Sequence, residues 1–238
     1  GGIIDALDMA KLKENPKVVC VGEVMNYREI IRPNNLEISK FIEDLRKVDK
    51  SFPIEGHCPN LVGLDLAKFL YLGIDSDHTE HTIEELYQRF SNGMFVEIQE
   101  KMLKKEVLDF IKNNNLYEYF CFVTDDVMAD TLYEQGQLNA LVKKAISLGF
   151  SPKQAIYNAS YTPSRRMNLF DRGVLAPGKI ADMVVLDNLE NFGVYETYKN
   201  GKLIYNRDSY NDTYVETPQF PESYYRSIKL LPINDSVF

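Results

Sequence analysis

The sequence predicts an α/β fold in which parallel strands alternate with helices and a smaller β-rich segment follows. Short apolar runs rich in Val, Ile and Phe recur between amphipathic stretches from residue 17 to residue 150. Strands joined by helices in this way favour parallel pairing, because the helix carries the chain back to the end of the sheet where the previous strand began. Beyond residue 170 the apolar residues alternate instead, around Asn200-Gly201, a strong hairpin signal.

The strands of the predicted sheet are apolar runs bounded by glycine, acidic or turn-forming residues. We expect them at residues 17–23, 52–57, 74–78, 94–100 and 119–126. Later β structure is expected at residues 173–187 and 195–206. The tail from residue 207 is aromatic and contains prolines, and we assign no structure to it. Two parts follow from this pattern, residues 1–170 and residues 171–238.

Helices are expected wherever apolar residues recur at helical spacing with charges between them. These stretches are residues 35–50, 61–73, 82–93, 104–115, 132–150 and 151–169. Thr82 is a plausible N-cap with acidic residues in the turn that follows, and Ser151-Pro152 suits the N-cap and first helical position.

Composition and charge restrict the partners and the compartment. The net charge of −8 repels phosphate backbones, so we expect no nucleic-acid partner. No run of about 18 apolar residues is present, so we expect no membrane-spanning segment. Three widely spaced cysteines suit reduced thiols better than a disulfide framework. These features predict a cytoplasmic protein.

The histidines point to a metal site. All three lie between residues 57 and 81, and two of them are the last residues of predicted strands. In a barrel of parallel strands the reacting groups gather at the carboxyl ends of the strands. The predicted strand ends carry Glu23, His57, Asp77, His78, Asp125 and Asp126. Imidazoles and carboxylates brought to one rim can bind a divalent transition metal, which lowers the pKa of bound water from about 15.7 toward 7.

Several neighbours of these residues have a plain structural interpretation. Asp125 directly follows an apolar run and is the better candidate to face the rim, whereas Asp126 caps the next segment or orients a substrate. His81 and Glu80 stand near a predicted helix start, and His81 favours a structural role. Side-chain alternation turns Cys58 away from the direction of His57, so we expect it to be structural as well.

Five stretches resemble the adenine deaminases of the amidohydrolase superfamily. They are GEVMN (22–26), EGHCPNLVGLDL (55–66), GIDSDHT (73–79), VTDD (123–126) and DRGVLAPGKIADMVVLDNLENF (171–192). The last stretch is common across the superfamily, and GEVMN is much more specific. The resemblance extends, with gaps, from about residue 4 to about residue 205.

The resemblance implies hydrolysis of adenine to hypoxanthine and ammonia in purine salvage, by attack of a metal-held hydroxide on C6. It implies one or two ions of manganese, iron or zinc. Glu23 resembles the glutamate that bridges two metals, and His57 and His78 resemble ligands after the fifth and sixth barrel strands. Asp125 resembles the eighth-strand aspartate that binds metal and handles a proton, so catalysis is assigned to Glu23, His78 and Asp125. Substrate contacts are expected from Asn26, Asp77, Glu80 and Asp126.

The chain departs from the family pattern in three places. It has no His-x-His pair of the kind that begins the first barrel strand, Thr79 displaces the expected glutamate to Glu80, and Gln99 replaces an expected arginine. The resemblance therefore implies about strands 4–8 of a TIM-type barrel followed by part of a small β-sandwich. Such a segment has open edges. We expect it to be weakly active alone and to associate with the missing N-terminal part or with a second copy.

Two alternatives stay open at this point. The altered residues 79 and 99 allow another nucleobase or cyclic-amide hydrolase of the same superfamily, and the missing His-x-His pair allows a degenerate, non-catalytic paralogue.

Overall fold

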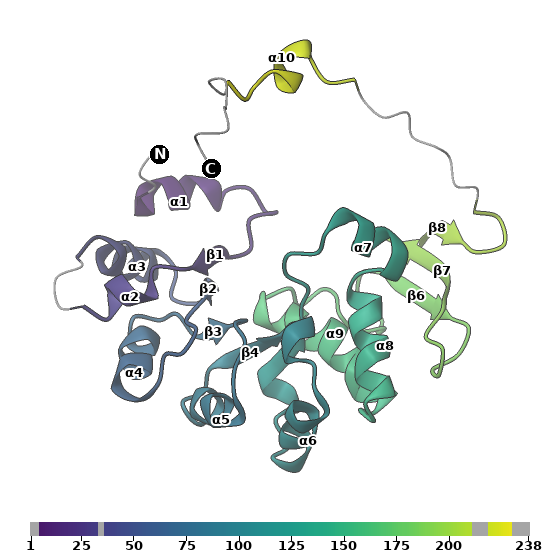
Figure 1. The fold of residues 1–238 in the computed structure, drawn as a ribbon, viewed down its shortest axis with the longest axis horizontal. Coiled ribbons are helices and arrows are strands. Elements are labelled where there is room, and N and C mark those ends of the chain that lie inside the picture. Colours follow the sequence, from purple (N-terminus) through teal and green to yellow (C-terminus); the bar gives the residue numbers. More distant parts are fainter. Residues whose placement is uncertain (1–4, 33–35, 211–218, 230–238) are drawn as a thin grey trace, which may run out of the picture.

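A computed structural model describes residues 5–32, 36–210 and 219–229 (Figure 1). Parallel strands alternate with helices, which confirms the α/β class. The parallel strands are β1 (Val21–Val24), β2 (Ile54–Gly56), β3 (Ser76–Asp77), β4 (Phe95–Ile98) and β5 (Phe120–Phe122). Each lies inside the range expected for it except β1, which extends one residue further and includes only the end of its predicted run.

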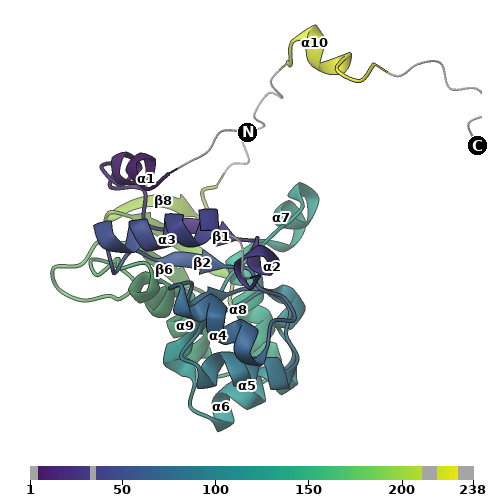
Figure 2. The ribbon, with the colours of Figure 1, turned by 90° about the vertical axis from the view of Figure 1, so that its left-hand side faces the viewer.

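The parallel strands form an open arc. β1 pairs with β2, and β3, β4 and β5 pair in that order. Figure 1 shows helices along the outer side of this arc and the strands within it. These outer helices are α3 (Leu36–Val48), α4 (Gly63–Tyr71), α5 (Ile83–Ser91) and α6 (Lys105–Asn113). In Figure 2, α3 and α4 lie on the side of the arc that faces the viewer.

The remaining helices show where sequence patterns mislead. They are α1 (Ala6–Leu12), α2 (Tyr27–Ile30), α7 (Ala129–Gln135), α8 (Leu138–Ser147), α9 (Pro152–Arg166) and α10 (Glu222–Tyr225), with 3₁₀ turns at Glu100–Met102 and Tyr117–Tyr119. The single helix expected at residues 132–150 is wrong, because Gly136 adopts a φ of +92° and ends α7. Neither α1 nor α2 was expected.

The predicted helix starts are borne out to different degrees. Thr82 caps α5 in a reciprocal capping box with Glu85: Thr82 N donates to Glu85 Oε2 at 2.8 Å, and Glu85 N donates to Thr82 Oγ1 at 3.3 Å. Pro152 occupies the first turn of α9, as expected, but the Ser151 side chain makes no capping hydrogen bond.

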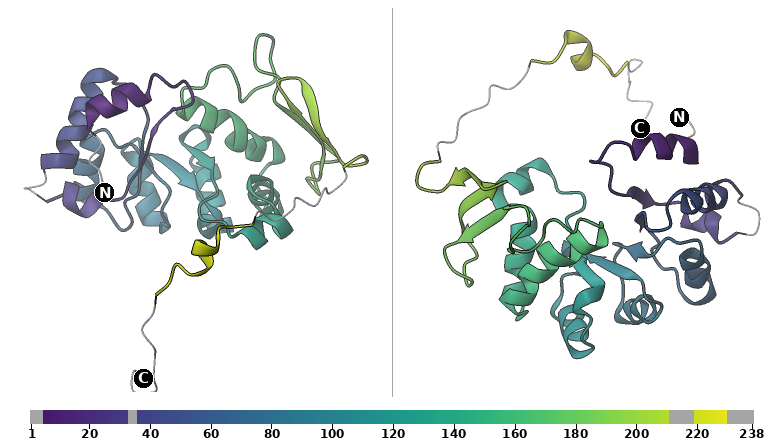
Figure 3. Two further views of the ribbon diagram at one scale, coloured as in Figure 1. Left: turned by 90° about the horizontal axis from the view of Figure 1, so that it is seen from above. Right: turned by 180° about the vertical axis from the view of Figure 1, so that it is seen from behind.

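A separate antiparallel sheet follows the helices. It consists of β6 (Met183–Leu186), β7 (Val194–Lys199) and β8 (Lys202–Asn206). Asn200 and Gly201 both have positive φ, as a type I′ turn between β7 and β8 requires, so the hairpin is confirmed. The strand expected at residues 173–187 is much shorter, and residues 173–182 contain bends, a turn and irregular backbone but no strand. Figures 1 and 3 place this sheet at the opposite end of the molecule from α1.

Two apolar clusters hold the parallel part together. One packs β4 and β5 against α6 and α8 and includes Val96, Phe120 and Ala145. The other packs β2 against α3 and α4 and includes Ile54, Leu45 and Phe69. Both clusters contain residues of the parallel strands and of the helices that pack against them. Within the described ranges, no helix is long and apolar enough to cross a membrane.

Strands β2 and β3 touch at Gly56. Its backbone N donates to Ser76 Oγ at 3.1 Å, and a Cβ at Gly56 would lie 2.2 Å from the backbone oxygen of Ser76. Gly56→Ala should therefore push these strands apart and lower the free energy of unfolding by about 1–3 kcal/mol, measured by urea denaturation. Gly22→Ala in β1 is the matched control, because nothing lies within 4 Å of its Cβ position. Equal losses in the two variants would contradict the close approach.

Candidate metal centre

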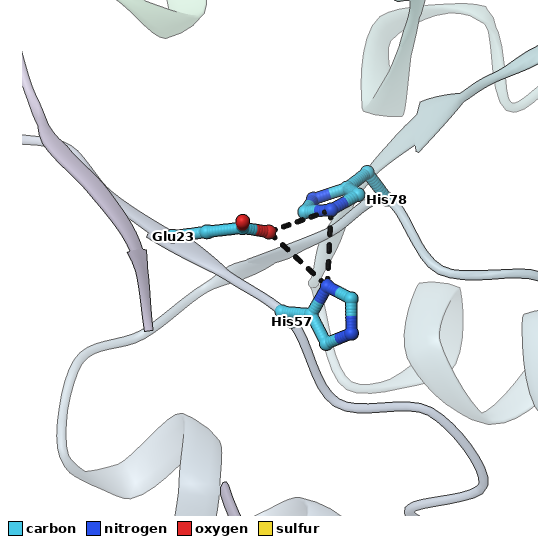
Figure 4. Close-up of side chains that lie close together, drawn as sticks. All are labelled: Glu23, His57 and His78. Carbon is cyan, nitrogen blue, oxygen red and sulfur yellow. Dashed lines mark hydrogen bonds and ion pairs between the residues drawn. The ribbon is translucent and has the colours of Figure 1, made fainter. Parts of the chain in front are cut away.

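Three neighbouring strands each bring one metal-ligating side chain to the same edge (Figure 4). Glu23 lies within β1, His57 directly follows β2, and His78 directly follows β3. Because parallel strands present their carboxyl ends on one side, residues at these positions meet although up to 55 positions separate them in the sequence.

The three ligand atoms form a nearly equilateral triangle. Glu23 Oε2 lies 3.1 Å from His57 Nδ1 and 2.9 Å from His78 Nε2, and the two imidazole nitrogens are 3.1 Å apart. The rings meet edge to face at an interplanar angle of 66°. The Glu23 side chain is 41% exposed, that of His57 27% and that of His78 13%, so the triangle can be reached from solvent.

This donor set fits a divalent transition metal. Bonds of about 2.1 Å in tetrahedral geometry separate ligand atoms by about 3.4 Å, close to the separations seen here. Two imidazole nitrogens with one carboxylate oxygen suit zinc, iron or manganese better than calcium or magnesium, which prefer oxygen ligands. Within the described part of the chain, no other group of three His, Cys, Asp or Glu residues could hold a metal ion.

The second nitrogen of His78 faces a buried acid. His78 Nδ1 lies 3.8 Å from Glu97 Oε2, and the backbone oxygen of His78 accepts a hydrogen bond from Gln99 Nε2 at 2.7 Å. Burial, together with the neighbouring Glu55 carboxyl, raises the pKa of Glu97 to about 9. The shift favours the neutral carboxyl form of Glu97 beside His78. Such partners on the far side of a histidine orient its ligating nitrogen.

The structure does not bring Asp125 into the triangle. Asp125 is exposed and lies beyond β5, separated from β3 by the intervening β4. Adjacent strands are about 4.8 Å apart, so an open sheet leaves strands two positions apart roughly 10 Å from each other. Asp125 instead lines a cavity of about 290 Å³ with Asp126, Gln99 and Met128.

The residues expected to contact substrate fall into two groups. Asn26, Glu80 and Asp126 are exposed, and Glu80 forms a surface ion pair with Lys104 at 3.1 Å. Asp77 differs, because its side chain is fully buried. As the structure places it, this carboxylate is not available to a substrate.

The reason for the Asp77 result is the alternation of side chains along a strand. Neighbouring residues point to opposite faces, so His78 faces the triangle while Asp77 faces the protein interior. Although burial alone would raise the pKa of Asp77, hydrogen bonding to His81 and the charge of Arg89 outweigh it and hold the pKa well below its ordinary value. Cys58, also directed inward, has its pKa raised by burial and by Asp77, so it is an unreactive thiol.

Sequence reasoning missed Glu55, Glu97 and Arg166. Arg166 Nη2 lies 3.0 Å from Glu55 Oε1 and 2.8 Å from Asp75 Oδ1. The sequence does hold a signal for the two acids. Glu55 and Glu97 each interrupt a short apolar strand at a position where an apolar core residue is usual.

The chain matches the Amidohydrolase family over residues 39–204. It is 43% identical to an adenine deaminase of Clostridium perfringens over 94% of this chain and 39% of that protein. It is 41% identical to adenine deaminase 2 of Shouchella clausii and to an adenine deaminase of Lactobacillus delbrueckii subsp. bulgaricus, in each case over the whole of this chain. The chain spans about 40% of the length of these relatives.

Solved structures share the fold at low sequence identity. A β-aspartyl dipeptidase from Fervidobacterium islandicum superimposes with a TM-score of 0.64 at 14% identity, covering 90% of this chain and 63% of that one. An N-acetylglucosamine-6-phosphate deacetylase from Thermotoga maritima superimposes with a TM-score of 0.58 at 19% identity, covering 85% and 76%.

Proposed function

Because this chain belongs to the amidohydrolase family, we propose that the protein carrying it converts adenine and water to hypoxanthine and ammonia. The observation that carries the proposal is the triangle of Glu23, His57 and His78, whose ligand atoms lie 2.9–3.1 Å apart. Identity of 41–43% to adenine deaminases supports adenine as the substrate.

Glu23, His57 and His78 would hold the metal. A bound divalent cation supplies Lewis acidity and lowers the pKa of a water molecule toward neutrality. Two histidines and one glutamate suit manganese, iron or zinc, and Glu23 would be shared if two ions bind. Glu97 would help to keep the His78 ring oriented, because its carboxyl group faces the nitrogen that does not point into the triangle.

Proton transfer is assigned to Asp125. Its carboxylate would accept a proton from the attacking water as the C6–O bond forms, and would then pass it to the amino nitrogen as the C6–N bond breaks. Hydrolysis balances in this way, since one water supplies the oxygen kept on C6, one proton that leaves with ammonia and one proton that stays on the hypoxanthine ring. Asp125 must approach the triangle for this step, which a sheet curved into a barrel would bring about.

Substrate contacts are assigned to the exposed polar side chains around the same rim. Asn26, Glu80 and Asp126 remain candidates, and the cavity beside Asp125 is lined by amide, carboxylate and apolar groups. Thr79 and Gln99 need no separate substrate role. Thr79 Oγ1 donates to Asp77 at 2.9 Å, and Gln99 binds the backbone of His78, so neither departure from the family pattern by itself favours a different substrate.

We further propose that β1–β5 correspond to about strands 4–8 of a TIM-type barrel and that β6–β8 belong to a small β-sandwich domain. Residues 1–170 and 171–238 would then be the two parts. Each outer strand of the described arc, β1 and β5, has a single strand neighbour. Additional strands, from another part of the protein or from a second copy, would close the barrel and cover these edges. The three unpaired cysteines suit a cytoplasmic protein.

Assay of the full-length protein against adenine, other nucleobases and cyclic amides tests the function. Among these compounds, we expect only adenine to release ammonia. The activity should be lost when a chelator removes the metal and should return when manganese, iron or zinc is added. Turnover of another base with adenine inert would favour a different hydrolase of the superfamily. If the purified protein binds no metal and turns over none of these substrates, the result would favour a non-catalytic relative.

A further inference from the structure

The Asp77 carboxylate connects the segment that carries His57 with the segment that carries His78. Asp77 Oδ2 lies 2.9 Å from Arg89 Nε, 3.0 Å from His81 Nε2 and 2.9 Å from Cys58 Sγ. Asp77 Oδ1 accepts from the backbone N of Cys58 at 3.3 Å and from Thr79 N and Oγ1 at 3.1 and 2.9 Å. The Asp77 and Arg89 side chains are both fully buried. These contacts use the acceptor capacity of the carboxylate on protein groups alone.

The guanidinium of Arg89 ties the same segments from the other side. Its Nη2 donates to the backbone oxygen of Cys58 at 2.8 Å, and its Nη1 donates to that of Leu61 at 3.2 Å and that of Glu85 at 3.3 Å. Arg89 lies on α5, which follows the His78 segment, whereas Cys58 and Leu61 lie on the loop after His57. A planar group with several fixed donors therefore spans both loops, which the single charge of a lysine could not do.

The contacts reach the immediate sequence neighbours of both metal-binding histidines. Cys58 follows His57 and Asp77 precedes His78, so each histidine is one peptide unit from the buried network. We propose that Asp77 and Arg89 form a clamp that sets the separation of the His57 and His78 imidazoles and so prepares the site for a cation. Both act through their neighbours as positioning residues, and neither contacts the metal or the substrate.

Stability alone is a poor explanation for such a clamp. Burying two charges carries a large desolvation cost, so apolar side chains of similar size would often stabilise the interior as well or better. What apolar side chains cannot supply is the set of directed bonds from Arg89 to two carbonyl oxygens of the preceding loop. The clamp rests on the proposed metal centre, and its test separates the two ideas.

The test measures the dissociation constant of manganese or zinc, by competition with a chromogenic chelator, for the full-length protein and its Arg89→Lys variant. Circular dichroism at the assay temperature confirms that each protein is folded. We expect Arg89→Lys to bind the metal about 10- to 100-fold more weakly. Thr79→Val, which removes one hydroxyl donor to Asp77, should weaken binding less and serves if Arg89→Lys does not fold.

Asn158→Ala is the matched control for a lost buried hydrogen-bond network. Asn158 is fully buried, and its side chain donates hydrogen bonds to the backbone oxygens of Tyr117 and Phe120, which lie outside both histidine segments. We expect its metal affinity to match that of the unmodified protein. Folded Arg89→Lys and Thr79→Val variants with unchanged affinity, or an equal loss in Asn158→Ala, would overturn the clamp. Failure of the unmodified protein to bind either metal would instead overturn the metal centre.

Discussion

Glu23→Gln should weaken metal binding at least about 100-fold and reduce adenine turnover by at least about a thousandfold. An outer partner of a metal ligand is worth about 10- to 100-fold in affinity, so a direct ligand should be worth at least as much. The neutral amide keeps the size of the side chain but loses the charged oxygen that lies 2.9 Å from His78 and 3.1 Å from His57. Without the metal, the attacking water keeps a pKa near 15.7 and little hydroxide forms at neutral pH.

Glu84→Gln provides the matched control, since it makes the same chemical change at an exposed position of α5. Metal content by elemental analysis, metal affinity and steady-state rates should be measured on both variants. Glu84→Gln should behave as the unmodified protein. A Glu23→Gln variant that retains full metal affinity would show that the carboxylate is not a ligand.

Arg89→Met should lower the free energy of unfolding by about 3–5 kcal/mol, measured by urea denaturation. Methionine fills much of the space but removes the guanidinium that pairs with the fully buried Asp77, and removal of one member of a buried ion pair costs about this much. The loss should exceed that of Gly56→Ala, because an unpaired buried charge costs more than a local backbone shift.

A double variant separates lost charge from lost packing. Adding Asp77→Asn to Arg89→Met removes the carboxylate charge that has lost its arginine partner and should recover part of the lost stability, so the two changes should not be additive.

The depressed pKa of Asp77 also predicts that the stability of the protein depends on pH. Its contribution to stability is present above the unfolded pKa of about 3.9 and is lost as the pH falls below it. A loss of less than about 1 kcal/mol in Arg89→Met would contradict the account.

Much of the fold could be predicted from local sequence because its strands are short apolar runs between amphipathic helices. The hairpin could also be predicted from the sequence, since Asn200 and Gly201 tolerate the positive φ of a type I′ turn. The break at Gly136 was not, because a single glycine inside an apolar spacing also occurs within continuous helices. The short helices α1 and α2 have too few turns to show a periodic pattern.

The candidate site divides along similar lines. The meeting of Glu23, His57 and His78 follows from one rule, that parallel strands present their carboxyl ends together. The burial of Asp77 also follows from strand alternation, the same rule that turns Cys58 away from His57. The contacts of Arg89 and of Glu97 could not be predicted, because they depend on how α5, β2 and β4 pack against one another in three dimensions.

The most direct test is a crystal structure of the full-length protein grown with manganese, with the ion located by its anomalous scattering. We expect an ion bound by Glu23 Oε2, His57 Nδ1 and His78 Nε2, at distances of about 2.0–2.3 Å. An ion bound elsewhere, with these three side chains turned away from one another, would contradict the proposed metal centre.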